Sequence, residues 1–256
     1  MQSPIPFLTV YVAVASAAAV VTLLWGLRAA VIRAELTARE RRRSLWAGAT
    51  LLVGWFFTAL LPARLELYQG GHTRIPTIEF GLLLPIIAGV IFYRSSSLLR
   101  RITAAASQGL LVGIQFYRVL GVIFLVLLVT GSMPRVFALP AGAGDLAVGF
   151  LAPVVALAFT RGWRGAPGLV RAWNLLGLAD LVVAVTTGFL SSPSPLQSFA
   201  MDHPNTLITT FPVVMIPVFL VPLAVLLHLA SLANLARNDA PSPTSFLPRH
   251  HLEQTS

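Results

Sequence analysis

Residues 108–131 have the sequence QGLLVGIQFYRVLGVIFLVLLVTG, an apolar run with one arginine, Arg118, near its middle. The run is long enough to cross a bilayer as a helix, which takes about 20 residues. Six further apolar runs share this character, at 6–32, 45–62, 77–98, 144–160, 168–190 and 211–234. The sequence therefore predicts an all-α integral membrane protein, a bundle of seven transmembrane helices.

The composition supports a membrane protein and excludes several chemistries. Of the 256 residues 56% are hydrophobic and 11% are charged, with a mean hydropathy of +0.81, whereas soluble domains have about 25% charged residues. The absence of cysteine excludes disulfides, thiolate metal sites and thiol nucleophiles. All basic residues are arginine, so Schiff-base chemistry on lysine, including attachment of retinal, is excluded as well.

The arginines predict an orientation in the membrane, because cytoplasmic loops are enriched in basic residues. The turns on one side of the predicted bundle contain 14 of the 18 arginines, and the turns on the other side contain three. The first group is Arg28, Arg33, Arg39, Arg41, Arg42, Arg43, Arg94, Arg100, Arg101, Arg161, Arg164, Arg171, Arg237 and Arg249, and the second is Arg64, Arg74 and Arg135. We therefore expect an outside N-terminus and a cytoplasmic C-terminus in a bacterial-type inner membrane, with the lipid bilayer rather than nucleic acid as the partner of the basic residues.

The domain organisation is simple. Residues 1–237 form the predicted transmembrane domain, and the first apolar run is kept as a span because it is too long for a signal sequence. The tail 238–256 is rich in proline, serine and threonine, and we expect it to be disordered in the cytoplasm.

Polar residues at hydrocarbon depth are the candidate functional residues, because lipid does not solvate them. Gln115 and Arg118 are three residues apart and share a helix face. Arg118 lies about 15 Å from the cytoplasmic end of its span, and Asp180, which shares a span with Asn174, lies about 18 Å from that end. Arg118 and Asp180 are expected to pair, either as a structural ion pair or as the floor of a substrate or ion site.

Two carboxylates and one histidine complete the candidate set. Asp145 is expected to begin the fifth span near the outer face, with Glu79 at a similar level. These two residues either border an outward vestibule or are solvated at the interface, and the same holds for the other outer-side residues, Arg135, His72, Asp202 and His203. His228 is the one histidine inside a span, either as a hydrogen-bonded core residue or in a proton relay, and no metal site is predicted. Prolines at 212, 217 and 222 predict bending of the last span.

The motif Gly142-Ala143-Gly144-Asp145 resembles the GxGD signature of the intramembrane aspartyl proteases, the group of presenilin, signal peptide peptidase and prepilin peptidase. The resemblance covers four residues and implies a second aspartate on an earlier helix. No aspartate precedes Asp145 in this chain, and Asp180 follows it.

The leading hypothesis is a protein that binds or transports a small molecule or ion. Its ligand site would contain Arg118, Asp180, Gln115, Asn174, Asp145 and His228. No catalytic residue is assigned and no cofactor is indicated. The alternatives are a membrane enzyme acting on a lipid-soluble substrate, with Asp145, Asp180 and His228 in acid–base roles, and a non-catalytic subunit that docks on a membrane partner or forms an oligomer.

Overall fold

The structure is a computed structural model that describes residues 6–69 and 77–238. Within these ranges the chain forms helices joined by turns and short connections, with no strand. His72, Arg74 and the predicted disordered tail lie outside the described residues, apart from Asn238, which ends the last helix.

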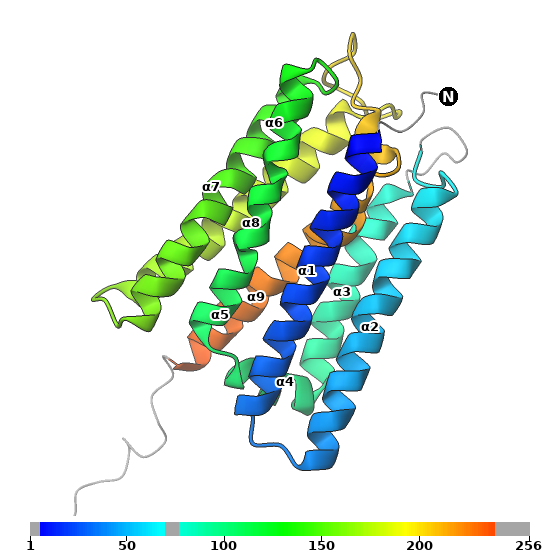
Figure 1. Cartoon of the computed structure of the whole chain (residues 1–256). Coiled ribbons are helices and arrows are strands. Elements are labelled where there is room, and N and C mark those ends of the chain that lie inside the picture. The colour runs from blue at the N-terminus through cyan, green and yellow to red at the C-terminus, as the bar shows by residue number, and fades with distance from the viewer. Residues whose placement is uncertain (1–5, 70–76, 239–256) are drawn as a thin grey trace, which may run out of the picture.

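Seven helices of the described chain are long and apolar enough to span a membrane (Figure 1). This confirms the predicted all-helical fold and the predicted number of long apolar helices. They are α1 (Pro6–Arg33), α2 (Ala38–Arg64), α3 (Ile78–Ser95), the composite helix of α5 (Gln108–Gly113), η1 (Ile114–Gly121) and α6 (Val122–Val129), α7 (Arg135–Thr160), α8 (Ala166–Ser191), and η3 (Ile216–Leu220) continued by α9 (Val221–Asn238).

The start of the fifth helix differs from the prediction. Helix α7 begins at Arg135, directly after Pro134, nine residues before the expected start at 144. Pro140 and the glycines that follow it lie inside the helix rather than in a turn. Asp145 is therefore ten residues into α7, about 15 Å from its beginning, and the prediction that it begins the span near the outer face is wrong.

A short helix that the sequence did not predict follows α3. Helix α3 ends at Ser95, and the Ser96 hydroxyl accepts a hydrogen bond from Leu99 N–H, which starts α4 (Ser97–Ala105). The predicted span 77–98 therefore includes the beginning of a separate helix. In Figure 1, α4 lies at the end of the bundle where α1 finishes.

The arginine-containing turns gather at that same end of the bundle (Figure 1). The end of α1, the start of α2, α4, the α7–α8 turn and the end of α9 all lie there, and we call it the arginine-rich end. The end where α1 begins, here the N-terminal end, has Arg64 and Arg135 among the described residues. This arrangement follows the predicted alternation, while the orientation in a membrane stays a prediction.

Two segments depart from α-helical geometry, and they lie against each other. Segment η1 is a 3₁₀-helix, and its three residues per turn align Gln115, Arg118 and Gly121, all of them buried. Segment η3 is π-helical, with Val221 N–H donating to the Ile216 carbonyl.

The predicted bending of the last helix takes the form of this π-helical turn. Pro217 lies inside η3 and Pro222 is the second residue of α9, and neither has an N–H to donate. The helix starts at Ile216 instead of 211. Segment η1 contacts the widened region through the Tyr117 hydroxyl, which donates to the Leu220 carbonyl at 3.1 Å.

The last helix is the centre of the bundle. More than half of its most apolar stretch is buried, compared with 6% for α3. Phe219 in η3 is fully buried, and its ring lies 5.1 Å from Trp55 and 5.3 Å from Phe56 of α2. Large apolar residues of α2 and α3 on the outer surface, such as Leu51 and Ile91, are exposed, as expected for helices that face lipid.

Candidate functional site

Arg118 forms ion pairs with two aspartates in the middle of the bundle. Its Nε and Nη2 each lie 2.8 Å from Asp145 Oδ1, and Nη2 also contacts Asp180 Oδ2. The predicted pairing of Arg118 with Asp180 is therefore present, and Asp145 is a second partner. The Arg118 side chain is 2% exposed, while those of Asp145 and Asp180 are 17% and 10% exposed. We call these three residues the charged centre.

The Arg118 guanidinium also has partners beyond the two carboxylates. The Nε and Nη2 groups bind the carboxylates, and Nη1 lies 3.2 Å from His228 Nε2 and 3.5 Å from the Gly177 carbonyl. Each of the three guanidinium nitrogens therefore has at least one partner within the protein.

Three glycines allow the helices to come close enough for this arrangement. A Cβ added at Gly121 would overlap the Asp145 side chain, one at Gly144 would overlap the Asp180 carboxylate, and one at Gly177 would overlap the His228 ring. Gly144 is the glycine that precedes Asp145 in the GxGD-like motif. In this structure it leaves room for the Asp180 carboxylate.

A network of buried polar side chains continues from the charged centre toward the arginine-rich end. His228 Nδ1 lies 2.9 Å from Asn174 Oδ1, and Asn174 Nδ2 donates to Ser231 Oγ at 2.9 Å. Gln108 Nε2 also donates to Ser231, at 2.5 Å. Because Nε2 of His228 accepts from Arg118, we assign the proton to Nδ1. These four residues, which we call the polar seal, join α5, α8 and α9.

A cavity of about 380 Å³ lies on the other side of the charged centre, toward the N-terminal end. Helices α3, α7, α8 and segment η3 contribute its walls, which are mostly apolar. Leu83 and Pro193 on its rim are exposed, so the cavity is open to the outside of the molecule. Asp145 lies in its wall, together with Phe137 and Leu181.

A second cavity, of about 30 Å³, touches Arg118, Asp145 and Tyr117. It shares Asp145, Leu181, Ile216 and Val221 with the large cavity. Its volume is sufficient for a water molecule, which needs at least about 10–15 Å³ by this measure. The small cavity therefore lies next to the large one, on the side of the charged centre.

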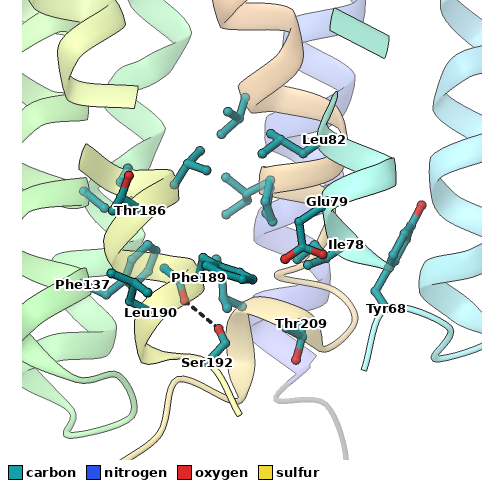
Figure 2. Close-up of a pocket in the computed structure, with 18 of the residues that line it drawn as sticks. Tyr68, Ile78, Glu79, Leu82, Phe137, Thr186, Phe189, Leu190, Ser192 and Thr209 are labelled. Atoms are coloured by element: carbon teal, nitrogen blue, oxygen red, sulfur yellow. Dashed lines mark hydrogen bonds between the residues drawn. The ribbon is translucent and has the colours of Figure 1, made fainter. Parts of the chain in front are cut away.

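Glu79 is the most unusual polar group in the large cavity. Both of its carboxylate oxygens are buried, and neither has a hydrogen-bond partner among the described residues. Figure 2 shows the side chain pointing from α3 toward Phe189 of α8. The lining residues Ser192 and Thr209 donate to backbone carbonyls. Burial raises the pKa of Tyr68, so its hydroxyl remains neutral at physiological pH.

The remaining residues predicted to contribute to the site lie at different places. Gln115 is fully buried, but it donates to the Ala224 carbonyl at 3.1 Å and does not contact a carboxylate. Asn174 and His228 belong to the polar seal. Asp202 and His203, which the sequence placed on the outer side, are exposed and do not line the cavity.

Sequence reasoning missed Ser231 and Gln108. Ser231 is three residues after His228 and therefore shares its helix face, a signal that was available in the sequence. Gln108 begins an apolar run, where a polar residue is common, so nothing distinguished it. The close-approach glycines 121 and 177 gave no signal either, since glycine is frequent throughout the chain.

The geometry of the charged centre differs from that of an aspartyl protease. The protease mechanism needs two carboxylates that share a proton, whereas both carboxylates here are paired with Arg118. The described residues also contain no group of three or more acidic or histidine side chains placed to hold a metal ion.

The comparison found no matching curated protein and no matching solved structure. Residues 75–236 match a family described as "Domain of unknown function (DUF8737)". The match covers well over half of the chain and includes the charged centre, the polar seal and all lining residues of the large cavity except Tyr68. The chain therefore belongs to the DUF8737 family.

Proposed function

We propose that this protein is a membrane transport protein for a small molecule or ion. The substrate enters the large cavity at the N-terminal end and binds at the charged centre. With the predicted orientation, the cavity opens to the outside of a bacterial-type inner membrane. The observation that carries the proposal is the position of Asp145, which lies in the wall of the open cavity and is also paired with the buried Arg118.

The two sides of the charged centre differ in the way that transport requires. Alternating access needs a central site that is open to one face and closed to the other. The cavity gives access from the N-terminal end, and the polar seal closes the path to the arginine-rich end, since Ser231 and Asn174 are fully buried. This arrangement corresponds to an outward-open state.

Segments η1 and η3 interrupt two of the long helices next to the site, and these helices can change shape there. Interruptions of α-helical geometry in membrane helices accompany binding sites and hinges. Arg118 lies in η1, and Ile216 and Pro217 of η3 line the large cavity. Because the two segments contact each other through Tyr117, a movement of one is transmitted to the other.

Single cysteines in this naturally cysteine-free chain test the proposal. Val185→Cys, in the cavity wall, should react with a membrane-impermeant thiol reagent applied from the N-terminal side. Val183→Cys is the control, because it is two residues away on α8, exposed on the outer surface, where we expect lipid and no reaction.

Transport also requires that the site become accessible from the arginine-rich side. Ser231→Cys, in the polar seal, should react with reagent applied from the arginine-rich side, because that path opens during the transport cycle. If Val185→Cys does not react, there is no accessible site and the proposal is wrong. If Val185→Cys reacts but Ser231→Cys never does from the arginine-rich side, the chain binds its ligand without transporting it.

A further inference from the structure

We infer that the ligand is an amphiphilic cation: an apolar body carrying a protonated amino group. This inference rests on the proposed function and names the substrate class of the same cavity. The amino group would bind between Glu79 and Asp145, and the apolar body would occupy the cavity between α3, α7 and α8. Three observations support this assignment.

The first observation is that the site has no charged donor left to offer. Each nitrogen of the Arg118 guanidinium already has a partner among Asp145, Asp180, His228 and Gly177. No arginine or histidine is among the described residues that line the large cavity. An anionic ligand would therefore find no cation to pair with.

The second observation is that the unused polar atoms are acceptors. Both oxygens of Glu79 lack a partner among the described residues. For Asp145, the hydrogen bonds from described residues all go to Oδ1, which leaves Oδ2 without a donor. A buried carboxylate oxygen without a donor is costly, and a ligand that supplies N–H donors removes this cost.

The third observation is the balance of formal charge. Glu79, Asp145 and Asp180 contribute three negative charges, and Arg118 contributes one positive charge. A monocation bound between Glu79 and Asp145 reduces the excess of negative charge in a region of low dielectric, where charge complementarity is strong. A neutral or anionic ligand does not.

The walls of the cavity fit the apolar part of such a ligand. Phe124, Phe137 and Phe189 line it together with leucine, isoleucine and valine side chains. The ring of Phe189 lies opposite the Glu79 carboxylate in Figure 2. An ammonium group held by Glu79 would be near the face or edge of this ring, where a cation–π contact adds to the ion pair.

Three rigid probes of one shape separate the ligand classes: 1-adamantanamine is a cation at neutral pH, 1-adamantanol is neutral and 1-adamantanecarboxylate is an anion. Binding is measured on the full chain in lipid nanodiscs by titration calorimetry, and by protection of Val185→Cys from the thiol reagent. We expect the amine to bind at least tenfold more tightly than the alcohol or the carboxylate. Equal or tighter binding of either of those, or no binding of the amine, overturns the inference.

A matched pair of variants locates the amino group. Glu79→Gln keeps the shape of the side chain and removes its charge, and it should weaken amine binding at least tenfold. Glu66→Gln makes the same change at an exposed position outside the cavity and should leave affinity unchanged. Asp145→Asn, which keeps the Arg118–Asp180 pair, should also weaken binding of the amine. Unchanged amine affinity in both Glu79→Gln and Asp145→Asn overturns the assignment.

The outcomes distinguish this inference from the proposed function. If the thiol reagent reaches Val185→Cys and the amine does not protect it, the cavity is accessible and the choice of a cation is wrong. If the reagent does not reach Val185→Cys at all, the proposed function itself is wrong. Thermal melting of each variant in the same nanodiscs identifies any loss of folding, and a variant that unfolds is replaced by Glu79→Ala or Asp145→Ser at the same position.

Discussion

At the scale of single residues, the three members of the charged centre differ in how much the stability of the fold depends on each. One buried arginine is bound by two carboxylates, of which Asp145 lines both cavities. Removing the arginine leaves two buried anions without a counterion, whereas removing one aspartate charge leaves a neutral ion pair. The three residues therefore differ in what their loss costs, although all three belong to one cluster.

This inequality gives the first prediction. Arg118→Met should lower the free energy of unfolding by about 3–5 kcal/mol, the cost of breaking a buried pair from one side. Asp145→Asn should cost clearly less, because Asp180 still pairs with Arg118. Circular dichroism during denaturation in mixed micelles measures both.

The control is Arg101→Met, which removes an exposed pair with Glu40 and should leave the free energy of unfolding almost unchanged, because solvent screens surface ion pairs. If Asp145→Asn lowers the free energy of unfolding as much as Arg118→Met does, Asp180 alone is not a sufficient partner for Arg118 and the prediction is wrong.

The second prediction concerns close approach at glycine. Gly144→Ala places a methyl group on the Asp180 carboxylate and should separate Asp180 from Arg118, with a marked drop in melting temperature. Gly54→Ala is the matched control, because no atom lies within 4 Å of the added Cβ in α2, and alanine favours a helix over glycine by about 0.5–1 kcal/mol. The prediction fails if the two variants melt at the same temperature.

At the scale of elements, helix ends are fastened by side chains from distant helices. Asn234 of α9 donates to the carbonyls of Thr103, Ala104 and Ala106, at 2.9, 3.3 and 3.0 Å, where α4 ends. The Thr103 carbonyl also accepts from the Ala106 N–H, whereas the carbonyls of Ala104 and Ala106 lie where α4 offers no further backbone donor. One asparagine side chain thus holds the short helix against the last helix of the bundle.

The third prediction follows from this contact. Asn234→Ala should cost about 1–3 kcal/mol, because it leaves buried carbonyls without donors, and it should loosen α4. Trypsin should then cleave faster after Arg100 and Arg101, which mass spectrometry of the fragments measures. Ser95→Ala removes an exposed hydroxyl from the same end of the bundle and should leave the cleavage rate unchanged. Equal rates for the two variants would contradict the role given to Asn234.

At the scale of the whole molecule, arginine and tryptophan gather in the same half. Trp25, Trp46 and Trp163 lie in the arginine-rich half with exposed side chains. Tryptophan is enriched where a membrane protein meets the boundary between lipid and water. Both residue types therefore favour placing this end of the bundle at a membrane surface, and the arginines favour the cytoplasmic one.

The fourth prediction tests that orientation in intact cells. Leu196→Cys, in the connection that follows α8 at the N-terminal end, should be labelled by an impermeant maleimide. Arg164→Cys, in the α7–α8 turn, should be labelled after the cells are opened. Both positions are exposed in the structure. If Arg164→Cys is labelled in intact cells and Leu196→Cys is not, the orientation is the opposite of the predicted one.

The predictions made from sequence succeeded where the property is local. Hydropathy along the chain gave seven apolar helices, and counting residues placed Arg118 and Asp180 at similar depths. The prediction for Asp145 failed because Pro140 and the glycines after it were interpreted as a turn. Helix α7 includes them, packed against η1 and α8, and this tertiary contact outweighs the low helix propensity of glycine and proline.

The sequence by itself determined the class of the protein, the number of its long apolar helices, and the end at which its arginines gather, because these depend on composition and order along one dimension. The tertiary structure alone decided that Asp145 joins Arg118, that Glu79 shares a cavity with Asp145, and that Ser231 and Gln108 extend the polar seal. Those facts depend on the face that each helix turns to its neighbours. Segments η1 and η3 alter that face, because three residues per turn in one and a widened turn in the other replace the 3.6-residue period from which helix faces are predicted.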